Sequence, residues 1–335
     1  MAFKINKGIN ISHWLSQSER RGKERREYFT REDISRIVDL GFDHIRLPVD
    51  EVQLWNEYGN LDNETADLLN TAIHWCDCQN LRTVVDLHIL RSHFFNDKEV
   101  PRLFSDQSEL LRFANLWAEL SSVIQEWSNE KTAYEILNEP IARDPQDWNR
   151  VSGFIFSELR KRESDRTIIL GSNWFSAVNT FDVLEVPRDE NIILTFHYYL
   201  PMLLTHYKAS WLELGKYDGP INYPGYPILP EIFDQLNEPL KSTVAEQNVF
   251  YNRNKIIEDL YMPLEKRKQT GKPLYCGEFG VIRNVPMEIR RLWYDDIISV
   301  FHEYDISFCH WDYRGVFGIL DENRKDTGIL PILLH

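Results

Sequence analysis

Two glutamates of this chain stand in short strings in which a carboxylate could do chemistry. Glu139 lies in LNEP, directly before a proline, and Glu278 lies in CGEFG, where the glycines allow close approach to the backbone. A glycosidic bond is hydrolysed by such a pair, because one carboxyl group protonates the leaving oxygen while the other acts on the opposite side of the sugar. The pair therefore indicates this chemistry, provided that the fold brings both residues to one place.

Short β-branched runs alternate with longer amphipathic runs, and these elements must position the two glutamates. The predicted strands cover residues 7–12, 43–49, 82–89, 132–137, 167–172, 191–199, 273–280 and 306–313. The predicted helices cover residues 31–40, 64–79, 108–128, 147–163, 251–270 and 287–304. Strands that nearly all alternate with helices predict an α/β fold, a closed (β/α)8 TIM barrel.

We expect one domain over residues 1–335, with a long aromatic-rich loop at 200–250 after the sixth strand. Loops of this length in a compact domain are usually functional. An open, doubly wound sheet is the alternative fold. It is disfavoured because the string GINISHW contains one glycine and lacks the Gly-rich phosphate turn of dinucleotide-binding proteins.

Polar and aromatic residues gather at the C-terminal ends of the predicted strands, the end of a barrel that faces its active site. Arg46 and Tyr199 are suitable donors to keep a nucleophilic carboxylate ionised, whereas an acid needs burial or a negative neighbour to stay protonated. Asn138 is placed to reach a sugar hydroxyl. Beside the two glutamates, the strand-end set consists of His13, Trp14, Arg46, His88, Asn138, Trp174, His197, Tyr199 and Trp311.

The strings that carry these residues resemble glycoside hydrolase family 5, the cellulase family of a large retaining (β/α)8 clan. They are YEILNEP, CGEFG, GFDHIRLPVD, VVDLHI and HYY, together with Trp311, and they follow the family's order between residue 8 and about residue 315. The resemblance implies that Glu139 is the general acid/base and Glu278 the nucleophile. It also implies a double displacement with net retention that needs no metal or organic cofactor.

The resemblance implies roles for the neighbouring residues as well. Arg46 and Tyr199 would contact the nucleophile, and His197 would lie near the acid/base. His88 and Asn138 would hold the sugar in the −1 subsite. Two further expectations concern the stacking platform of that subsite, Trp311, and a buried carboxylate with a structural role, Glu135.

Aromatic residues are numerous, with 10 Trp and 15 Tyr. Aromatic rings stack on the apolar faces of equatorial sugars, so those in barrel-end loops are candidates to line an open cleft. The loop candidates are Trp14, Trp174, Trp211, Tyr207, Tyr223 and Tyr226. We expect the tryptophans on predicted helices to be core residues; these are Trp75, Trp117 and Trp127.

Resemblance to the family leaves the sugar open. A β-linked polysaccharide or oligosaccharide is the expected substrate, and an endo-β-1,4-glucanase acting on cellulose-like or mixed-linkage glucans is the first choice. An exo-β-1,3-glucanase or β-glucosidase-type enzyme is the alternative if the loop at 200–250 closes one end of the cleft. A β-mannanase is the third possibility within the family.

Two alternatives lie outside this class of enzyme. A metal-dependent barrel hydrolase would use His13, His88, His197 and Asp312, but the His-x-His string and bridging Lys of such sites are missing. A non-catalytic sugar-binding barrel is disfavoured by the two intact glutamates.

The charge of the chain limits its partners. It has 38 basic and 52 acidic side chains, which gives a net charge of −14 at pH 7 and argues against nucleic-acid binding. No run approaches the roughly 20 apolar residues that span a bilayer, so no membrane partner is expected. We see no signal peptide, and we expect either a cytoplasmic protein or a secreted one whose leader is absent from this chain. Without a sustained heptad pattern, a monomer is expected.

Two further patterns are expected to be structural. The basic run at 20–26 is interleaved with glutamates, so a solvated loop is preferred to a site for acidic polysaccharide. Cys276 and Cys309 lie in apolar strand-like runs, where buried, reduced thiols are expected. A disulfide between them requires neighbouring strands, and a zinc site that adds Cys76 and Cys78 is disfavoured by the spacing.

Overall fold

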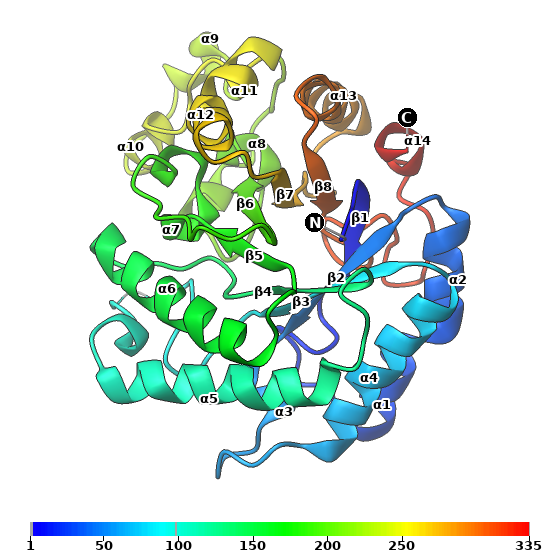
Figure 1. Ribbon diagram of the computed structural model, residues 1–335. Coiled ribbons are helices and arrows are strands. Elements are labelled where there is room, and N and C mark those ends of the chain that lie inside the picture. The colour runs from blue at the N-terminus through cyan, green and yellow to red at the C-terminus, as the bar shows by residue number, and fades with distance from the viewer. Residues whose placement is uncertain (1–2, 98, 335) are drawn as a thin grey trace.

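The eight strands pair in parallel and in sequence order to form a closed barrel in the computed structural model, which describes residues 3–97 and 99–334 (Figure 1). They are β1 (Lys7–Asn10), β2 (His44–Val49), β3 (Arg82–Leu87), β4 (Thr132–Glu135), β5 (Ile168–Gly171), β6 (Ile192–Tyr198), β7 (Leu274–Phe279) and β8 (Ser307–His310). β8 pairs with β1 and closes the ring. The predicted (β/α)8 TIM barrel is confirmed.

Burial explains why the strands read as nearly continuous apolar runs. Every residue of β2, β6 and β7 is buried, as expected for parallel strands that are covered on both faces. The long outer helices that cover the ring are α2 (Arg31–Asp39), α4 (Asn63–Cys78), α5 (Gln107–Ile124), α6 (Pro145–Arg162), α11 (Arg253–Asp259), α12 (Tyr261–Thr270) and α13 (Met287–Glu303).

One predicted helix is wrong in its continuity. The segment 251–270 forms the two helices α11 and α12 rather than one, with a break at Leu260. Pro263 lies in the first turn of α12, the part of a helix that tolerates a residue without a backbone N–H.

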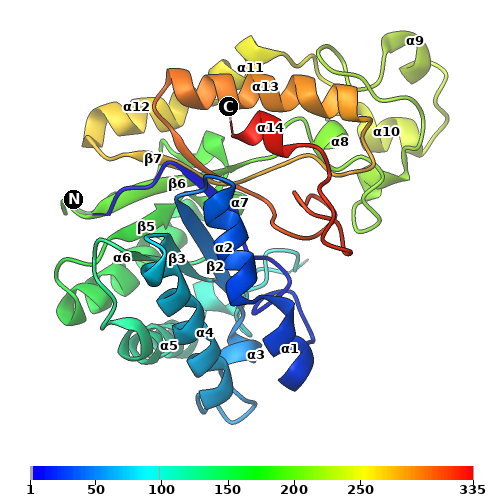
Figure 2. The same cartoon turned by 90° about the vertical axis from the view of Figure 1, so that its right-hand side faces the viewer.

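The long segment after β6 contains short helices rather than being an open loop. They are α8 (Met202–Thr205), the 3-10 turn η3 (Glu213–Lys216), α9 (Pro230–Phe233) and α10 (Leu240–Ala245). Figure 2 shows α8, α9 and α10 on the right, away from the N-terminus, and α1 (Gly22–Tyr28) and α3 (Glu51–Leu54) in the lower part of the view. Because the segment follows the C-terminal end of β6, it begins on the face of the barrel where the strands end.

Short elements complete the chain. They are the 3-10 turns η1 (Arg102–Phe104) and η2 (Val178–Thr180) and the helices α7 (Asn173–Ser176) and α14 (Leu330–Leu333). None of the helices in the described part of the chain is both long and apolar enough to cross a membrane.

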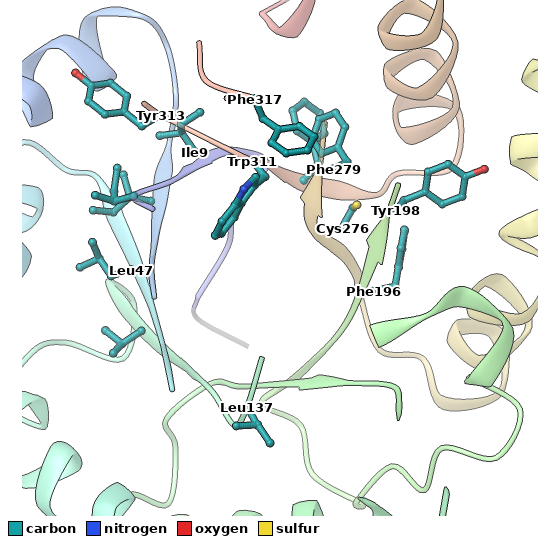
Figure 3. Packing of buried hydrophobic residues seen from close by; sticks show 14 of the residues in the cluster. Ile9, Leu47, Leu137, Phe196, Tyr198, Cys276, Phe279, Trp311, Tyr313 and Phe317 are labelled. Atoms are coloured by element: carbon teal, nitrogen blue, oxygen red, sulfur yellow. The ribbon is translucent and has the colours of Figure 1, made fainter. Parts of the chain in front are cut away.

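The core between sheet and helices is strongly aromatic. Trp117 of α5 is buried, packs against Tyr134 with the rings tilted by 30°, and donates its Nε1–H to Ile136 O at 2.9 Å, which confirms its predicted core position. Trp75 and Trp127 are half-buried and pack against the same core. Tyr198 points outward from β6, whereas Trp311 points toward the middle of the ring of strands (Figure 3).

Two cysteines lie on neighbouring strands and are nevertheless free thiols in the described structure. Cys276 packs in the layer between β7 and the helices, while Cys309 packs in a smaller apolar cluster with Phe3 and Tyr275. The thiols belong to different clusters because alternate strand residues face opposite sides of a sheet. This confirms the expectation of buried, reduced cysteines at both positions.

The basic run at 20–26 differs from its prediction. Residues 22–28 form α1, and Arg25 is only 1% exposed, with its guanidinium against Gln53 of α3. The solvated-loop prediction is therefore wrong at Arg25, which holds the two short helices together.

Candidate active site

Glu139 and Glu278 come from opposite sides of the barrel and meet at one imidazole. His197 Nδ1, at the end of β6, lies 2.8 Å from Glu139 Oε1 and 3.6 Å from Glu278 Oε2. One carboxylate oxygen of each glutamate and a nitrogen of His197 all lie within 4.8 Å of one another. The fold thus brings together two carboxyl groups that are 139 positions apart in the chain, as 278 − 139 shows.

Glu278 is held by two donors. Arg46 Nη1 donates to its Oε1 at 2.7 Å, and the Tyr199 hydroxyl donates to its Oε2 at 3.0 Å. Burial raises the pKa of Glu278 to about 7, while the positive charge of Arg46, and that of the His197 ring when it is protonated, act in the opposite direction. Both hydrogen bonds stabilise the ionised carboxylate. Each oxygen of Glu278 therefore has a donor that favours its charged form.

The surroundings of Glu139 favour its protonated, neutral form instead. Burial raises its pKa to about 8, and the negative charges of Asp86 and Glu135 add to this effect, with Arg46 opposing it. Burial also lowers the pKa of His197 to about 4, so the ring beside Glu139 is neutral near pH 7. As pH rises, Glu278 therefore loses its proton before Glu139 does, which is the order that the predicted acid role of Glu139 needs.

Glycine makes room for the imidazole between the two glutamates. A Cβ atom at Gly277 would lie 3.2 Å from His197 Nε2 and 2.8 Å from Thr195 Oγ1. Any side chain at that position would press on the His197 ring, so the glycine in CGEFG belongs to the architecture of the site.

Arg46 contacts three carboxylates of the site, those of Asp86, Glu135 and Glu278, and orients them. It is fully buried, and its Nε and Nη2 atoms donate to the two oxygens of Glu135 at 2.8 and 2.9 Å. Nη2 also lies 3.0 Å from Asp86 Oδ2 and donates to Asn138 Oδ1 at 2.9 Å. A bidentate arginine fork fixes geometry as well as charge. The predicted buried, structural position of Glu135 is confirmed.

His88 and Trp311 form a parallel pair at the mouth of the barrel. Their ring centroids are 5.7 Å apart and their planes differ by 6°. Asp86 Oδ2 lies 3.1 Å from His88 Nδ1, and the Gln17 amide Nε2 lies 3.2 Å from His88 Nε2. Burial lowers the pKa of His88 to about 3, so a neutral ring donates to Asp86 and accepts from Gln17. The imidazole thereby fixes the plane of the Trp311 indole.

Comparison of the chain with models of known protein families identifies the family to which it belongs. The model of the family described as Cellulase (glycosyl hydrolase family 5) matches residues 8–315, which is nearly the whole chain. The chain belongs to glycoside hydrolase family 5. It is therefore an enzyme that hydrolyses glycosidic bonds, and the family suggested by the strings around the two glutamates is confirmed.

Individual known proteins are similar over most of the chain. Endoglucanase C of Acetivibrio thermocellus is 32% identical over 325 residues, which cover 95% of this chain and 94% of that protein. Cellodextrinase A of Ruminococcus flavefaciens is 31% identical over 309 residues, covering 90% of this chain and 84% of its own. The crystal structure of endoglucanase Cel5A from Thermotoga maritima matches with a TM-score of 0.78 at 23% identity, covering 98% and 96% of the two chains.

Three residues of this family 5 enzyme that contact the site were missed by reasoning from the sequence. Asp86 precedes His88 by two positions on a strand, so the period of two could have placed both on one face. Gln17 lies in the irregular segment after β1, and no periodic pattern indicates that its amide reaches His88. Asn10, which donates from Nδ2 to Gly277 O at 3.0 Å and accepts from Arg46 Nη1, was likewise overlooked at the end of β1.

Three aromatic residues that were predicted to line the cleft lie elsewhere. Trp14 is 1% exposed, packs against Phe29 with its ring tilted by 53°, and donates from Nε1 to Arg25 O at 2.8 Å, because α1 covers the turn that follows β1. Tyr207 and Tyr223 are also buried, with their hydroxyls bonded to Gly219 O and Asp296 Oδ2 at 2.7 Å each. The predictions of sugar contact at these three positions are wrong.

Trp174 is placed as a ligand-contacting aromatic would be. Its side chain is 53% exposed in the segment after β5, where residues 174–176 all have left-handed backbone angles. The next residue, Phe175, donates its N–H to Pro140 O at 3.2 Å, so the segment is tied directly to the residue that follows Glu139. Trp211 and Tyr226 are exposed as well, on the segment between β6 and β7.

The four residues of the metal-hydrolase alternative do not converge. His13 Nε2 lies 3.9 Å from Asp312 Oδ2, but His88 is engaged with Asp86 and His197 with Glu139. In the described part of the chain, the metal-like spacing belongs instead to Glu139, His197 and Glu278. Two of these three groups are the carboxyl pair of a glycosidase site, and the four residues of the alternative metal set are not brought together.

Proposed function

We propose that this family 5 enzyme is an endo-β-1,4-glucanase that acts on cellulose-like or mixed-linkage glucans with net retention of configuration. The observation that carries the stereochemistry is the spacing of Glu139 and Glu278, whose oxygens approach within 4.8 Å. Retaining glycosidases hold their carboxyl groups about 5–5.5 Å apart, and inverting ones need about 6.5–9.5 Å to fit a water molecule. The spacing supports direct attack by one carboxylate.

Glu139 and Glu278 would divide the first step between them. Glu139 transfers its proton to the glycosidic oxygen while Glu278 Oε attacks the anomeric carbon, so that the leaving alcohol departs and a glycosyl-enzyme ester forms. In the second step the Glu139 carboxylate takes a proton from water, the water oxygen bonds to the anomeric carbon, and Glu278 leaves as a carboxylate. Two inversions at one carbon restore its configuration.

Two unpartnered polar atoms support the placement of a sugar in this site. Asn138 Nδ2 and His197 Nε2 are buried and have no hydrogen-bond partner within the described residues, although the opposite atom of each side chain is engaged. A buried donor without a partner is costly, and a sugar hydroxyl at the −1 position would satisfy it. Trp311, 8% exposed and parallel to His88, supplies the apolar platform beneath that sugar.

The choice of glucan rests on the similar proteins. The relatives over most of the chain are named endoglucanases, and one is named a cellodextrinase, which makes short β-1,4-gluco-oligosaccharides the second candidate substrate. The site geometry is common to both, since they differ in chain length rather than in the bond cleaved.

A substrate panel tests the proposal. Carboxymethylcellulose, mixed-linkage glucan, laminarin, mannan, xylan and cellopentaose should be digested in parallel, with products resolved by reducing-end chromatography and viscosity followed over time. An endo-acting enzyme lowers viscosity long before many reducing ends appear. Faster release from laminarin or mannan than from the β-1,4-glucans would overturn the proposed specificity, and unchanged viscosity with steady release of short sugars would favour the cellodextrinase.

A further inference from the structure

Glu139 has a backbone conformation that a non-glycine residue rarely adopts. Its φ angle is 44°, in the left-handed region. This conformation is unfavourable for an L-residue and persists only where the surrounding structure fixes it. β4 ends at Glu135, so Glu139 lies beyond the last residue of the strand and outside its regular hydrogen bonds. The chain on both sides of Glu139 must therefore be held by other groups.

On the N-terminal side of Glu139 the chain is fixed to the barrel. Asn138 donates its N–H to Leu87 O at 3.1 Å, which continues the pairing of β3 with β4 beyond the end of β4. The direction of the Glu139 side chain then depends on how the chain continues after it.

The chain after the proposed acid/base is held by the segment that follows β5, the strand next to β4 (Figure 1). The Asn173 amide pairs with the backbone of Ala142, because its Oδ1 accepts the Ala142 N–H at 2.9 Å and its Nδ2 donates to Ala142 O at 2.8 Å. Phe175 adds its N–H to Pro140 O at 3.2 Å. Within the described part of the chain, these are the three hydrogen bonds that residues 140–142 make.

Asn173 is itself firmly placed. It is 4% exposed and lies just beyond the end of β5. Its backbone oxygen accepts from Thr180 Oγ1 at 2.8 Å and from the Ala177 N–H at 3.2 Å, and Ser172 Oγ donates to Ala177 O at 2.7 Å. The turn is thus closed by its own hydrogen bonds, and both polar atoms of the Asn173 amide are left to hold Ala142.

We propose that Asn173 is a positioning residue for the acid/base of this enzyme. By pairing with Ala142 it fixes the chain after Glu139, as the barrel fixes the chain before it, so that the carboxyl group keeps its place 2.8 Å from His197 Nδ1. Both amide atoms of Asn173 are engaged with the backbone, so the residue acts through residues 140–142 rather than on the substrate. The inference rests on the proposed role of Glu139 as the acid.

Loss of this pairing should impair proton transfer in particular. A shift of about 1 Å in a catalytic group can cost about 10²-fold in rate, and general acid catalysis contributes about 10²–10⁴-fold. Leaving groups that need a proton should show this loss, whereas those that depart unaided should not. The dependence of kcat/KM on the leaving group therefore distinguishes a misplaced acid from a general loss of structure.

Two aryl cellobiosides test the proposal on the intact chain. Asn173→Ala should lower kcat/KM by about 10-fold or more for phenyl cellobioside, a poor leaving group, and by less than about 2-fold for 2,4-dinitrophenyl cellobioside. The ratio kcat/KM is chosen because it reports on the first step, in which the leaving group departs. Equal losses on both substrates would overturn the proposal.

The chain offers a matched control in Asn248. Its amide makes the same pair with Ile228, accepting the N–H at 2.8 Å and donating to the oxygen at 3.0 Å, within the segment between β6 and β7. Asn248→Ala should lower Tm, as Asn173→Ala should, because each loses two hydrogen bonds. It should affect the two cellobiosides equally. A leaving-group dependence as large as that of Asn173→Ala would overturn the proposal.

Two further variants keep the outcome decisive. If Asn173→Ala does not fold, Asn173→Asp keeps the shape of the side chain and the acceptor for the Ala142 N–H but loses the donor to Ala142 O. It should show the same leaving-group dependence with a smaller loss, and equal losses on both substrates would again overturn the proposal. Glu139→Ala is measured in the same series. Equal losses in that variant would remove the acid role and this inference together, whereas a leaving-group dependence in Glu139→Ala that the Asn173 variants lack would overturn the positioning role alone.

Discussion

The Tyr199 hydroxyl donates to Glu278 Oε2 at 3.0 Å, while Arg46 donates to Oε1 of the same carboxylate at 2.7 Å. Each oxygen of the proposed nucleophile thus has its own donor. This arrangement favours the ionised carboxylate and turns its second oxygen away from Arg46. Removing the hydroxyl should therefore act on the ionisation of Glu278 before it acts on anything else.

We predict a bell-shaped pH profile that Tyr199→Phe shifts on one side. Activity should rise as Glu278, with a pKa of about 7, loses its proton, and fall as Glu139, with a pKa of about 8, loses its own. The two limbs report the pair as a whole. Tyr199→Phe removes a hydrogen bond to the ionised form, so the acidic limb of kcat/KM should move to higher pH. A profile that loses height without moving would show that Tyr199 does not tune Glu278.

Glu139→Ala should separate substrates by their leaving groups. Hydrolysis of cellulose-like glucans should fall by about 10²-fold or more, because their alkoxide leaving group needs protonation. The first step with an activated aryl cellobioside should be largely retained, measured as the burst of released phenol, since that leaving group departs without a proton. Glu130→Ala, which changes an exposed glutamate, is the control. Equal losses on both substrates would mean that Glu139 is not the acid.

Glu139→Gln should stabilise the protein, and increasingly so as pH rises. Burial raises the pKa of Glu139 from its ordinary value of 4.5 to about 8, so the folded protein holds a proton that the unfolded chain releases between these values. The stability of the wild type therefore falls with pH across this window, by at most about 1.4 kcal/mol per pH unit from this group. Glutamine cannot ionise, so the variant does not lose this part of its free energy of unfolding as pH rises. Urea unfolding at pH 5 and pH 8 measures the free energy of unfolding of both proteins. A difference between variant and wild type that stays constant with pH would contradict the assigned pKa shift.

Trp174→Ala should weaken binding of long substrates more than it slows the chemistry. Its exposed ring lies on the segment bonded to Pro140, next to the proposed acid/base Glu139. We expect KM for cellopentaose to rise about 10-fold, as sugar–ring stacking of about 1–1.5 kcal/mol would give, with kcat on an aryl cellobioside unchanged. Tyr261→Ala removes an aromatic on α12 that is also exposed, at 64% against 53% for Trp174, and should change neither. Equal effects of both substitutions would dismiss Trp174 as a ligand contact.

Exhaustive chelation should leave the activity of the enzyme unchanged. Glu139, His197 and Glu278 have a spacing that could hold a metal ion, but the proposed reaction uses the same groups as acid, neutral ring and nucleophile. Dialysis against EDTA followed by assay on a β-1,4-glucan measures this directly. Loss of activity that Zn²⁺ or Mn²⁺ restores would make the three residues a metal centre and overturn the proposed mechanism.

Reasoning from the sequence located the strands and most of the strand-end residues. In a parallel barrel each strand is an apolar run of known polarity, so the residue at its C-terminal end must lie at the mouth whatever surrounds it. This is why the amino-acid pattern alone could place Asn138, His197 and Glu278, whereas Arg46 lies within β2 rather than at its end. The alternation of strand residues also assigns Glu135 to the interior.

Only the tertiary structure decided what covers each loop residue and how close the two glutamates come. Trp14 is buried because α1 packs over it. Tyr223 is buried as well, and its hydroxyl donates a hydrogen bond to Asp296 of α13. Both contacts join distant parts of the chain. No local pattern encodes such a contact, since the same aromatic side chain is suited to a core or to a sugar. The separation of Glu139 from Glu278 likewise depends on the closure of the whole ring, which places His197 between them.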